Sequence, residues 1–217
     1  MSLVDVIGWS ATLVGALLGL PQLLRLIRTH SVEGLSLLAW RAVLTLNIVW
    51  LGHGLHIGQP PQVVTNLVAL SLTLPLVILL ARASGRSLPL VLAPSLAAAA
   101  LIITVDLTLG SLAFGIAAII PGILANAGQS VELVRSPLVS GVSPMFLLLA
   151  CLNQCLWLTW ALLVPDPGTI FAATLTLTMT SFNLIWFGLR RLGVRAHFIR
   201  PADVAASLSD APALAAR

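Results

Sequence analysis

The chain has 217 residues, of which 59% are hydrophobic and only 8% charged, and its mean hydropathy is +1.05. A soluble domain carries about 25% charged residues. This composition therefore excludes a soluble enzyme, a disordered chain and a disulfide scaffold, and it indicates that lipid is the main solvent. The eleven basic residues are all arginine and give a net charge of +4. Their positions indicate membrane orientation, so we expect a lipid bilayer and no nucleic acid as a partner.

Seven apolar segments are long enough to cross a bilayer as helices. Between Asp5 and Arg25, for example, lie nineteen uncharged residues, which reach about 28 Å as a helix. Turns rich in proline and glycine end the second and sixth segments. In chain order, the predicted spans are 6–24, 35–57, 61–81, 88–105, 110–131, 142–164 and a seventh that ends before Arg190.

The charges at the ends of these spans predict the orientation. With the N-terminus outside, the inner side holds nine arginines and the outer side holds none, as the positive-inside rule requires. The predicted topology is therefore N-out and C-in. The outer side holds Asp5, Asp106 and Asp166, and we expect Asp106 and Asp166 to be solvated caps in outer loops. Residues 193–217 are expected to form a disordered cytoplasmic tail. The inner arginines are Arg25, Arg28, Arg82, Arg86, Arg135, Arg190, Arg191, Arg195 and Arg200.

An internal repeat appears when the chain is shifted against itself by 107 residues. Each copy holds three spans with the same order of charges, so a single extra crossing must restore the orientation between them. The prediction is an all-α membrane protein with two parallel three-helix bundles, residues 1–82 and 108–192. An inversion linker helix, residues 83–107, joins them. The matched pairs include Gly8/Gly115, Gln22/Gln129, Arg28/Arg135, Ser36/Ser143, Trp50/Trp157 and Pro60/Pro167.

Two segments of the first copy resemble a known transporter signature. The segment 20–25, LPQLLR, followed by 31–36, SVEGLS, resembles the PQ-loop signature of the SWEET and SemiSWEET (MtN3/saliva) sugar transporters. A weaker version recurs at Gly128-Gln129 and at 140–144, SGVSP. The resemblance implies the seven-helix 3+1+3 fold. It also implies facilitative, uncoupled and bidirectional transport of a small sugar-like solute by alternating access.

A layer of tryptophan and asparagine residues could bind such a solute. An indole ring covers the apolar face of a sugar while an amide exchanges hydrogen bonds with its hydroxyls. Helix spacing places Trp50, Asn66 and Trp157 about 8–10 Å below the outer surface. The resemblance implies that a Trp and an Asn from each repeat line the site, and the second-repeat counterpart of Asn66 is Ala173, a departure that makes that half less polar. The predicted binding residues are Trp50, Asn66, Trp157, Asn153, Asn47, Ala173 and Thr174.

A second set of residues is predicted to act in gating. Pro21 removes a backbone donor from the first helix and is expected to bend it, with Gln22 available to the freed carbonyl. The resemblance implies that prolines of this kind are hinges, and Pro144 matches one of them. His53 and His56 are interpreted as outer-gate or interface residues, because no further metal ligand is evident beside them. The predicted gate residues are Pro21, Gln22, Pro144, Gly128, Gln129 and His53.

Other function classes are less compatible with these residues. The chain has no lysine for a retinal Schiff base, and no clustered catalytic groups indicate an enzyme or a cofactor. Because acidic residues fall only at helix ends or in loops, we expect no ion coupling. The alternatives are a non-transporting PQ-loop receptor or assembly factor, or a PQ-loop transporter of a non-sugar solute such as an amino acid. Arginine without lysine, with abundant alanine, favours a bacterial plasma (inner) membrane, and a homo-oligomer is compatible with the sequence.

Overall fold

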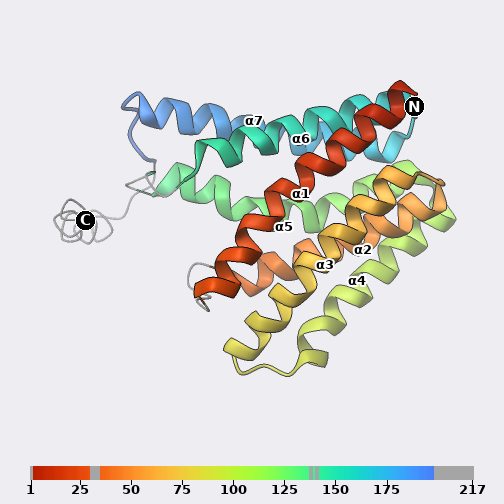
Figure 1. Cartoon of the computed structure of the whole chain (residues 1–217), viewed down its shortest axis with the longest axis horizontal. Helices are drawn as coiled ribbons and strands as arrows, with labels where there is room; N and C mark the ends of the chain where they lie inside the picture. The colour runs from red at the N-terminus through yellow and green to blue at the C-terminus, as the bar shows by residue number, and fades with distance from the viewer. Residues whose placement is uncertain (1, 30–34, 137–138, 140–141, 198–217) are drawn as a thin grey trace.

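The protein is described by a computed structural model that covers residues 2–29, 35–136, 139 and 142–197 (Figure 1). Within these residues all regular secondary structure is helical, so the predicted all-α, seven-helix fold is confirmed. The fourth helix continues to Leu109, beyond its predicted end, and therefore includes Asp106. The helices are α1 (Leu3–Thr29), α2 (Leu37–His56), α3 (Pro60–Ala83), α4 (Leu88–Leu109), α5 (Ser111–Arg135), α6 (Pro144–Leu163) and α7 (Pro167–Arg191).

Three helices begin at side-chain caps that the sequence supplies. The Ser36 hydroxyl accepts a hydrogen bond from the Ala39 amide at the start of α2, and Ser143, 107 residues later, does the same at the start of α6. Asp166 caps α7. Such caps satisfy amide groups that have no partner within the helix. Pro144 follows its cap directly, at a position where a missing N–H group leaves no hydrogen bond unmade.

The helices have the length and hydropathy of an integral multi-pass membrane protein. Within the described residues, α3 to α7 are each long and apolar enough to cross a membrane, and α1 contributes the apolar segment Leu3–Leu18. The second helix is more polar because it carries Arg41, Asn47 and two histidines. Polar groups on a membrane helix are stable where they face the protein interior. This is the case for His53, which is fully buried.

The helices pack as two groups of three that have the same internal order. In the first bundle α3 lies between α1 and α2, and in the second bundle α7 lies between α5 and α6. The fourth helix packs mainly against α2 and α5. The bundles meet through α1 against α6 and through α2 against α5, two contacts that the 107-residue repeat makes equivalent.

The two bundles converge at one end and separate at the other (Figure 1). We call the converging end, which holds the chain's N-terminus, the N-terminal end, and the opposite one the C-terminal end. Near the N-terminal end a single apolar core joins α2, α4 and α5 through Val49, Ala99 and Phe114. Toward the C-terminal end each bundle has its own core, around Leu44 and Val77 in the first and around Leu133, Leu147 and Phe187 in the second.

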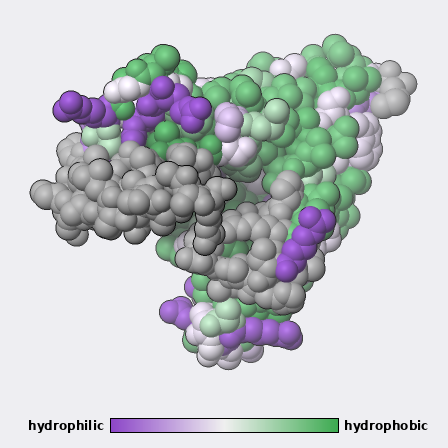
Figure 2. All heavy atoms as spheres, turned by 60° about the vertical axis from the view of Figure 1, so that its left-hand side comes forward, coloured by the Kyte–Doolittle hydropathy of each residue, from purple (hydrophilic) through white to green (hydrophobic). Residues whose placement is uncertain are grey.

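Figure 2 brings the C-terminal end forward and shows hydrophilic residues gathered there, with a hollow between apolar walls. Exposed arginines at helix ends account for much of this polar surface. Among residues 193–197, predicted to begin a disordered tail, the His197 amide instead donates to the Val134 carbonyl at 2.8 Å. The His197 ring also meets that of Trp186 edge-on. The remainder of the predicted tail lies outside the described residues.

Candidate functional site

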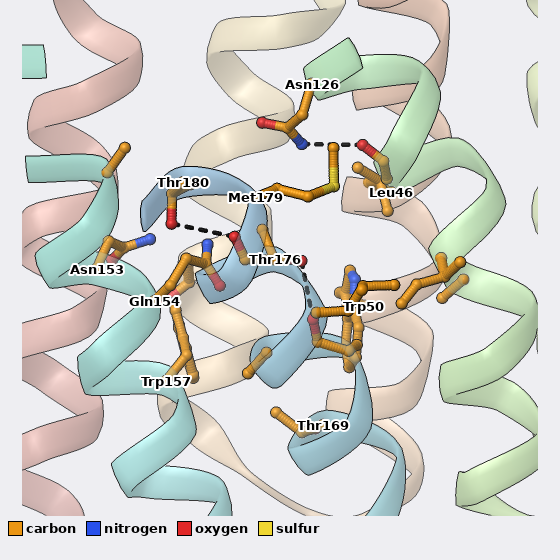
Figure 3. A pocket seen from close by; sticks show the side chains of 18 of the residues that line it. Leu46, Trp50, Asn126, Asn153, Gln154, Trp157, Thr169, Thr176, Met179 and Thr180 are labelled. Atoms are coloured by element: carbon orange, nitrogen blue, oxygen red, sulfur yellow. Dashed lines mark hydrogen bonds between the residues drawn. The ribbon is translucent and has the colours of Figure 1, made fainter. Parts of the chain in front are cut away.

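A cavity of about 330 Å³ lies between the two bundles (Figure 3). Six helices contribute to its wall, and α4 is not among them. The structure brings six of the seven predicted binding residues to this one wall. These are Asn47, Trp50, Asn66, Asn153, Trp157 and Ala173.

The cavity wall follows the internal repeat. Many of its residues occur in pairs that are 107 positions apart, so equivalent helices present equivalent positions to the same space. Gln154, the repeat counterpart of Asn47, was not among the predicted residues, although the offset that pairs the tryptophans also identifies it. The pairs are Leu46/Asn153, Asn47/Gln154, Trp50/Trp157, Gln62/Thr169, Thr65/Ala172 and Asn66/Ala173.

Thr174 does not line the cavity, contrary to the expectation from sequence. It is exposed, and its hydroxyl donates to the Ile170 carbonyl one turn earlier on α7. Successive residues of a helix point about 100° apart, so the neighbour of a wall residue such as Ala173 is turned away. Thr176 returns to the same helix face and lines the cavity instead.

The two tryptophans reach the cavity from opposite sides. Figure 3 shows Trp157 beside Asn153 and Gln154 on α6, while Trp50 lies on the opposite side of the cavity. Neighbouring rings hold both indoles in place. Trp50 meets Phe114 edge-on at 4.9 Å between ring centroids, and Trp157 meets Trp160 edge-on at 5.5 Å.

Several amide side chains contribute to the wall, among them Asn47, Asn66 and Gln154. The Asn47 side-chain amide donates to the Thr73 hydroxyl at 3.0 Å, and that of Asn66 donates to the Gln62 carbonyl at 2.8 Å. No described wall residue is charged. Amide groups without charged neighbours suit an uncharged ligand that can exchange hydrogen bonds through hydroxyl groups.

The predicted gate residues fall in different places. Pro21 and Gln22 belong to the helical backbone of α1, but their side chains lie outside the described residues. Gly128 is exposed on α5, and a side chain there would meet no other atom within 4 Å. Gln129 is half-buried on the same helix and does not line the cavity. Of the predicted gate residues whose side chains the structure describes, only His53 has polar contacts that join the two bundles.

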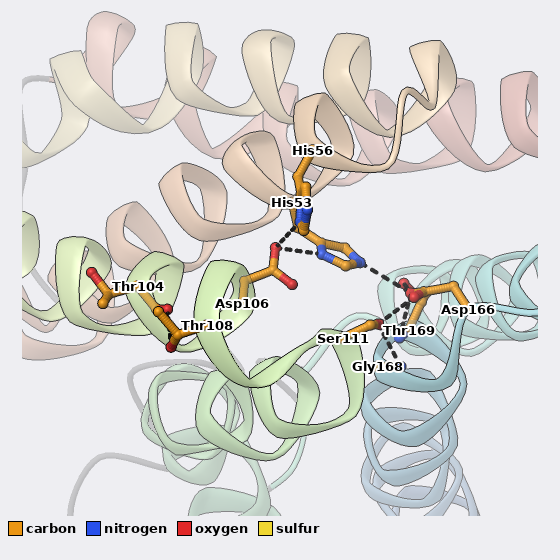
Figure 4. Close-up of polar contacts among 9 residues, drawn as sticks. All are labelled: His53, His56, Thr104, Asp106, Thr108, Ser111, Asp166, Gly168 and Thr169. Atoms are coloured by element: carbon orange, nitrogen blue, oxygen red, sulfur yellow. Dashed lines mark hydrogen bonds and ion pairs between the residues drawn. The ribbon is translucent and has the colours of Figure 1, made fainter.

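His53 is held between two buried carboxylates at the N-terminal end (Figure 4). Its Nδ1 lies 2.8 Å from Asp106 Oδ2, and its Nε2 lies 3.1 Å from Asp166 Oδ2. His56 Nδ1 lies 3.2 Å from the same oxygen of Asp106. The two carboxylates are 2% and 5% exposed, respectively.

These contacts correct three expectations from the sequence. Asp106 and Asp166 are not solvated caps, because α4 extends far enough to bury the first and the α6–α7 turn folds the second against α2. The two histidines do have a third group of metal-binding type beside them. Because Asp106 and Asp166 are buried, the lack of a buried carboxylate can no longer support the expectation of no ion coupling.

Asp166 contacts three helices, α2, α5 and α7, and one of its partners lines the cavity. Its carboxylate accepts hydrogen bonds from the Ser111 hydroxyl of α5 and from both the amide and the hydroxyl of Thr169 in α7. Burial alone would raise the pKa of Asp166, but the hydrogen bonds from His53, Ser111 and Thr169 lower it below its usual value. Thr169 also lines the cavity, so the cluster adjoins the candidate binding site.

Comparison with known proteins agrees with this architecture. Residues 3–53 match the family model of the PQ loop repeat. The structure of a eukaryotic SWEET transporter at 3.7 Å resolution superposes with a TM-score of 0.66 and 18% sequence identity, covering 88% of this chain and 100% of the other. No curated protein sequence matches the chain. The resemblance that the motifs predict is therefore confirmed: the chain carries a PQ-loop repeat within the fold of the SWEET transporters.

Proposed function

We propose that the protein is a membrane transporter that moves a small polar solute, most consistent with a sugar, by alternating access to the cavity between its bundles. One observation carries the proposal. The cavity lies between bundles that converge at the N-terminal end and separate at the C-terminal end (Figure 1). A solute in the cavity would therefore have a path to one side of the membrane at a time. Rocking of the two bundles about their shared contacts would reverse this arrangement.

The chemistry of the wall supports a sugar-like solute. A volume of about 330 Å³ is at the lower end of the roughly 300–1,000 Å³ of small-molecule sites. Two indole rings offer apolar faces, and the amide side chains of Asn47, Asn66 and Gln154 in the same wall can exchange hydrogen bonds with hydroxyl groups. The absence of charge among the described wall residues disfavours solutes with a net charge.

We further propose that movement follows the solute gradient, in a bacterial plasma membrane. The support is that ionisable groups lie beside the cavity, in the His53 cluster, and not among its described wall residues. Initial uptake should therefore be unchanged when a protonophore collapses the proton gradient. Accumulation against a solute gradient that disappears with the protonophore would contradict uncoupled movement and assign ion coupling to the cluster.

Solute flux in proteoliposomes tests the proposal. The purified chain is reconstituted, and uptake of labelled glucose, sucrose, ribose and neutral amino acids is measured. We expect saturable uptake of at least one sugar, reduced by Asn153→Ala and by Trp157→Ala. The matched control is Thr174→Val, which changes a polar residue of α7 outside the cavity wall and should leave uptake unchanged.

Two results would redirect the proposal. Uptake of an amino acid alone would keep the transporter and change the solute class. Binding of a panel member without flux, in vesicles where the protein is shown to be folded, would support a non-transporting receptor instead.

A further inference from the structure

Three potential ligand atoms converge at the N-terminal end of the bundle, where the last turns of α2 and α4 meet. One ligand atom from each of His53, His56 and Asp106 lies within 4.8 Å of the other two. The two histidines are three residues apart, so their rings leave α2 on the same face. Asp106 approaches from α4, and its second oxygen, Oδ1, is buried without a hydrogen-bond partner among the described residues.

Two protonation states of His53 are compatible with its contacts. Both of its ring nitrogens face carboxylate oxygens, which an imidazolium satisfies with two N–H groups and a neutral imidazole with only one. In the neutral form, with Nε2 donating to Asp166, Nδ1 presents a lone pair to Asp106 at 2.8 Å. A cation between these atoms makes the arrangement favourable, because lone pairs of nitrogen and oxygen are then ligands.

Asp166 occupies the place of a supporting residue for such a site. A histidine that binds a metal commonly donates its other N–H to a carboxylate, which fixes the tautomer and the ring orientation. Asp166 faces the distal nitrogen of His53 and is itself held by Ser111 and Thr169. The Phe114 ring, stacked on His53 at 4.3 Å between centroids, further restricts its rotation.

We propose that His53, His56 and Asp106 bind one divalent transition-metal cation of the zinc type, with Asp166 as the residue that orients His53. Two nitrogens and one oxygen are a ligand set that zinc accepts with a water in the fourth position. Zinc–ligand bonds of 2.0–2.1 Å place tetrahedral ligands about 3.3 Å apart. The observed separations of 2.8 and 3.2 Å need only small adjustments.

The site is accessible to an ion from solution. The side chain of His56 is 43% exposed, whereas those of His53 and Asp106 are 0% and 1% exposed. An ion bound here ties α2 to α4, while His53 continues to tie α2 to the second bundle through Asp166. Resting on the proposed function, we infer that zinc at this end holds the N-terminal end closed and slows solute movement.

Metal titration of the full chain in detergent micelles tests the site directly. Zn²⁺ is titrated in competition with a chromophoric chelator, and Co²⁺ is titrated with detection of its visible absorption, which reports tetrahedral coordination. We expect one ion per chain with micromolar or tighter affinity. His56→Ala removes an exposed ligand without disturbing the core and should weaken binding at least about tenfold.

Two further variants separate ligands from neighbours. Asp166→Asn should weaken Zn²⁺ binding about tenfold while leaving the stoichiometry and the tetrahedral Co²⁺ spectrum, since it orients a ligand and does not bind. Asp5→Asn changes another carboxylate predicted at the same membrane face, which bonds only Ser2 among the described contacts, and should leave binding unchanged.

The proposal is overturned if wild-type protein binds no stoichiometric Zn²⁺, in which case His53 is an imidazolium between two carboxylates. It is equally overturned if His56→Ala binds Zn²⁺ as tightly as wild type. Because binding is read without flux, a protein that binds zinc but moves no solute would refute only the transport proposal. Where flux is present, we expect Zn²⁺ to inhibit it in wild type, and in His56→Ala only at a Zn²⁺ concentration at least about tenfold higher.

Discussion

Two contacts join the bundles at the N-terminal end, and the 107-residue repeat makes them equivalent, but their chemistry differs. Where α1 meets α3 and α6, Gly8 lies against Pro61 of α3 and the fully buried Trp160 of α6. Where α5 meets α2 and α7, Gly115 lies against Gly168, the counterpart of Pro61. The counterpart of Trp160 is His53, which binds two carboxylates.

The difference shows that two repeats with the same fold can make equivalent helix contacts with different chemistry, one apolar and one polar. In each bundle, glycine at the equivalent position allows the first helix to approach the third closely, α1 to α3 through Gly8 and α5 to α7 through Gly115. A tryptophan then seals one contact by packing alone, and a histidine seals the other by charge and hydrogen bonds. The polar contact depends on solution conditions and bound ions, whereas the apolar contact depends on shape. The following predictions separate these two dependences.

The largest effect is expected from His53→Ala. Asp166 would keep its donors Ser111 and Thr169, but Asp106 would keep only the exposed His56, and an unpaired buried charge costs about 3–5 kcal/mol. Thermal unfolding in detergent measures the loss. Adding Asp106→Asn should restore a large part of the stability.

The apolar counterpart supplies the control. Trp160→Ala should lose a similar amount, about 3–5 kcal/mol, by leaving a cavity. Adding Asp106→Asn to Trp160→Ala should restore nothing. Equal rescue of both variants by Asp106→Asn would show that the two contacts do not differ as described.

A smaller effect is expected from adding one methyl group to each glycine. In Gly115→Ala the new carbon would overlap the Gly168 backbone, which cannot yield without moving a helix. In Gly8→Ala it would lie 2.8 Å from the Pro61 side chain. Overpacking of this kind costs about 1–3 kcal/mol, and the backbone clash should cost more than the side-chain one.

Gly128→Ala is the matched control, because it lies on α5 with no atom within 4 Å of the added carbon. Its unfolding temperature should stay the same or rise slightly. Thermal unfolding should rank the variants from most to least stable as Gly128→Ala, Gly8→Ala and Gly115→Ala. If Gly8→Ala were less stable than Gly115→Ala, the tighter contact would be the apolar one.

The two tryptophans of the cavity should be equivalent in transport but should differ in their effect on stability. Loss of one indole face should weaken apparent solute affinity about tenfold, or about 1.4 kcal/mol, in both Trp50→Ala and Trp157→Ala. Trp50 also packs on Phe114 and His53, so its removal should lower the unfolding temperature as well. Concentration-dependent flux and thermal unfolding of the same preparations measure the two effects. Unchanged flux in both variants would place the solute elsewhere.

The smallest effect is expected from Thr73→Val. The Thr73 hydroxyl accepts the amide of Asn47 and so orients its oxygen. Loss of one such hydrogen bond is worth about 0.5–1.5 kcal/mol. We expect a two- to tenfold weaker apparent affinity with unchanged maximal flux. A lower maximal flux at unchanged affinity would mean that Thr73 acts in the conformational change instead.

Much of the fold could be predicted from two features of the sequence, the positions of the charges and the internal repeat. Charges fall at the ends of apolar spans, and a single offset pairs Ser36 with Ser143 and Trp50 with Trp157. Because the two copies fold alike, this offset also carries equivalent residues to the same cavity. Thr174 is the exception, since adjacency in sequence does not mean a shared helix face.

The polar cluster could not be derived in this way. A hydropathy pattern places Asp106 and Asp166 at helix ends, but it does not say whether a helix end faces water or another helix. The contact of His53 with Asp166 joins residues 113 positions apart and has no counterpart in the repeat. Tertiary packing decides such contacts.

Alternating access is the central claim, and paired distances across the two ends of the bundle test it most directly. Spin labels at Gln59 and Pro165 report the N-terminal end, and labels at Ser84 and Arg191 report the C-terminal end, with each pair joining the first bundle to the second. Distances are measured in lipid nanodiscs with and without the sugar that gives the highest flux. We predict that the solute lengthens the first distance in part of the population and shortens the second in that same part. Two distances that stay fixed, or that lengthen together, would contradict this account.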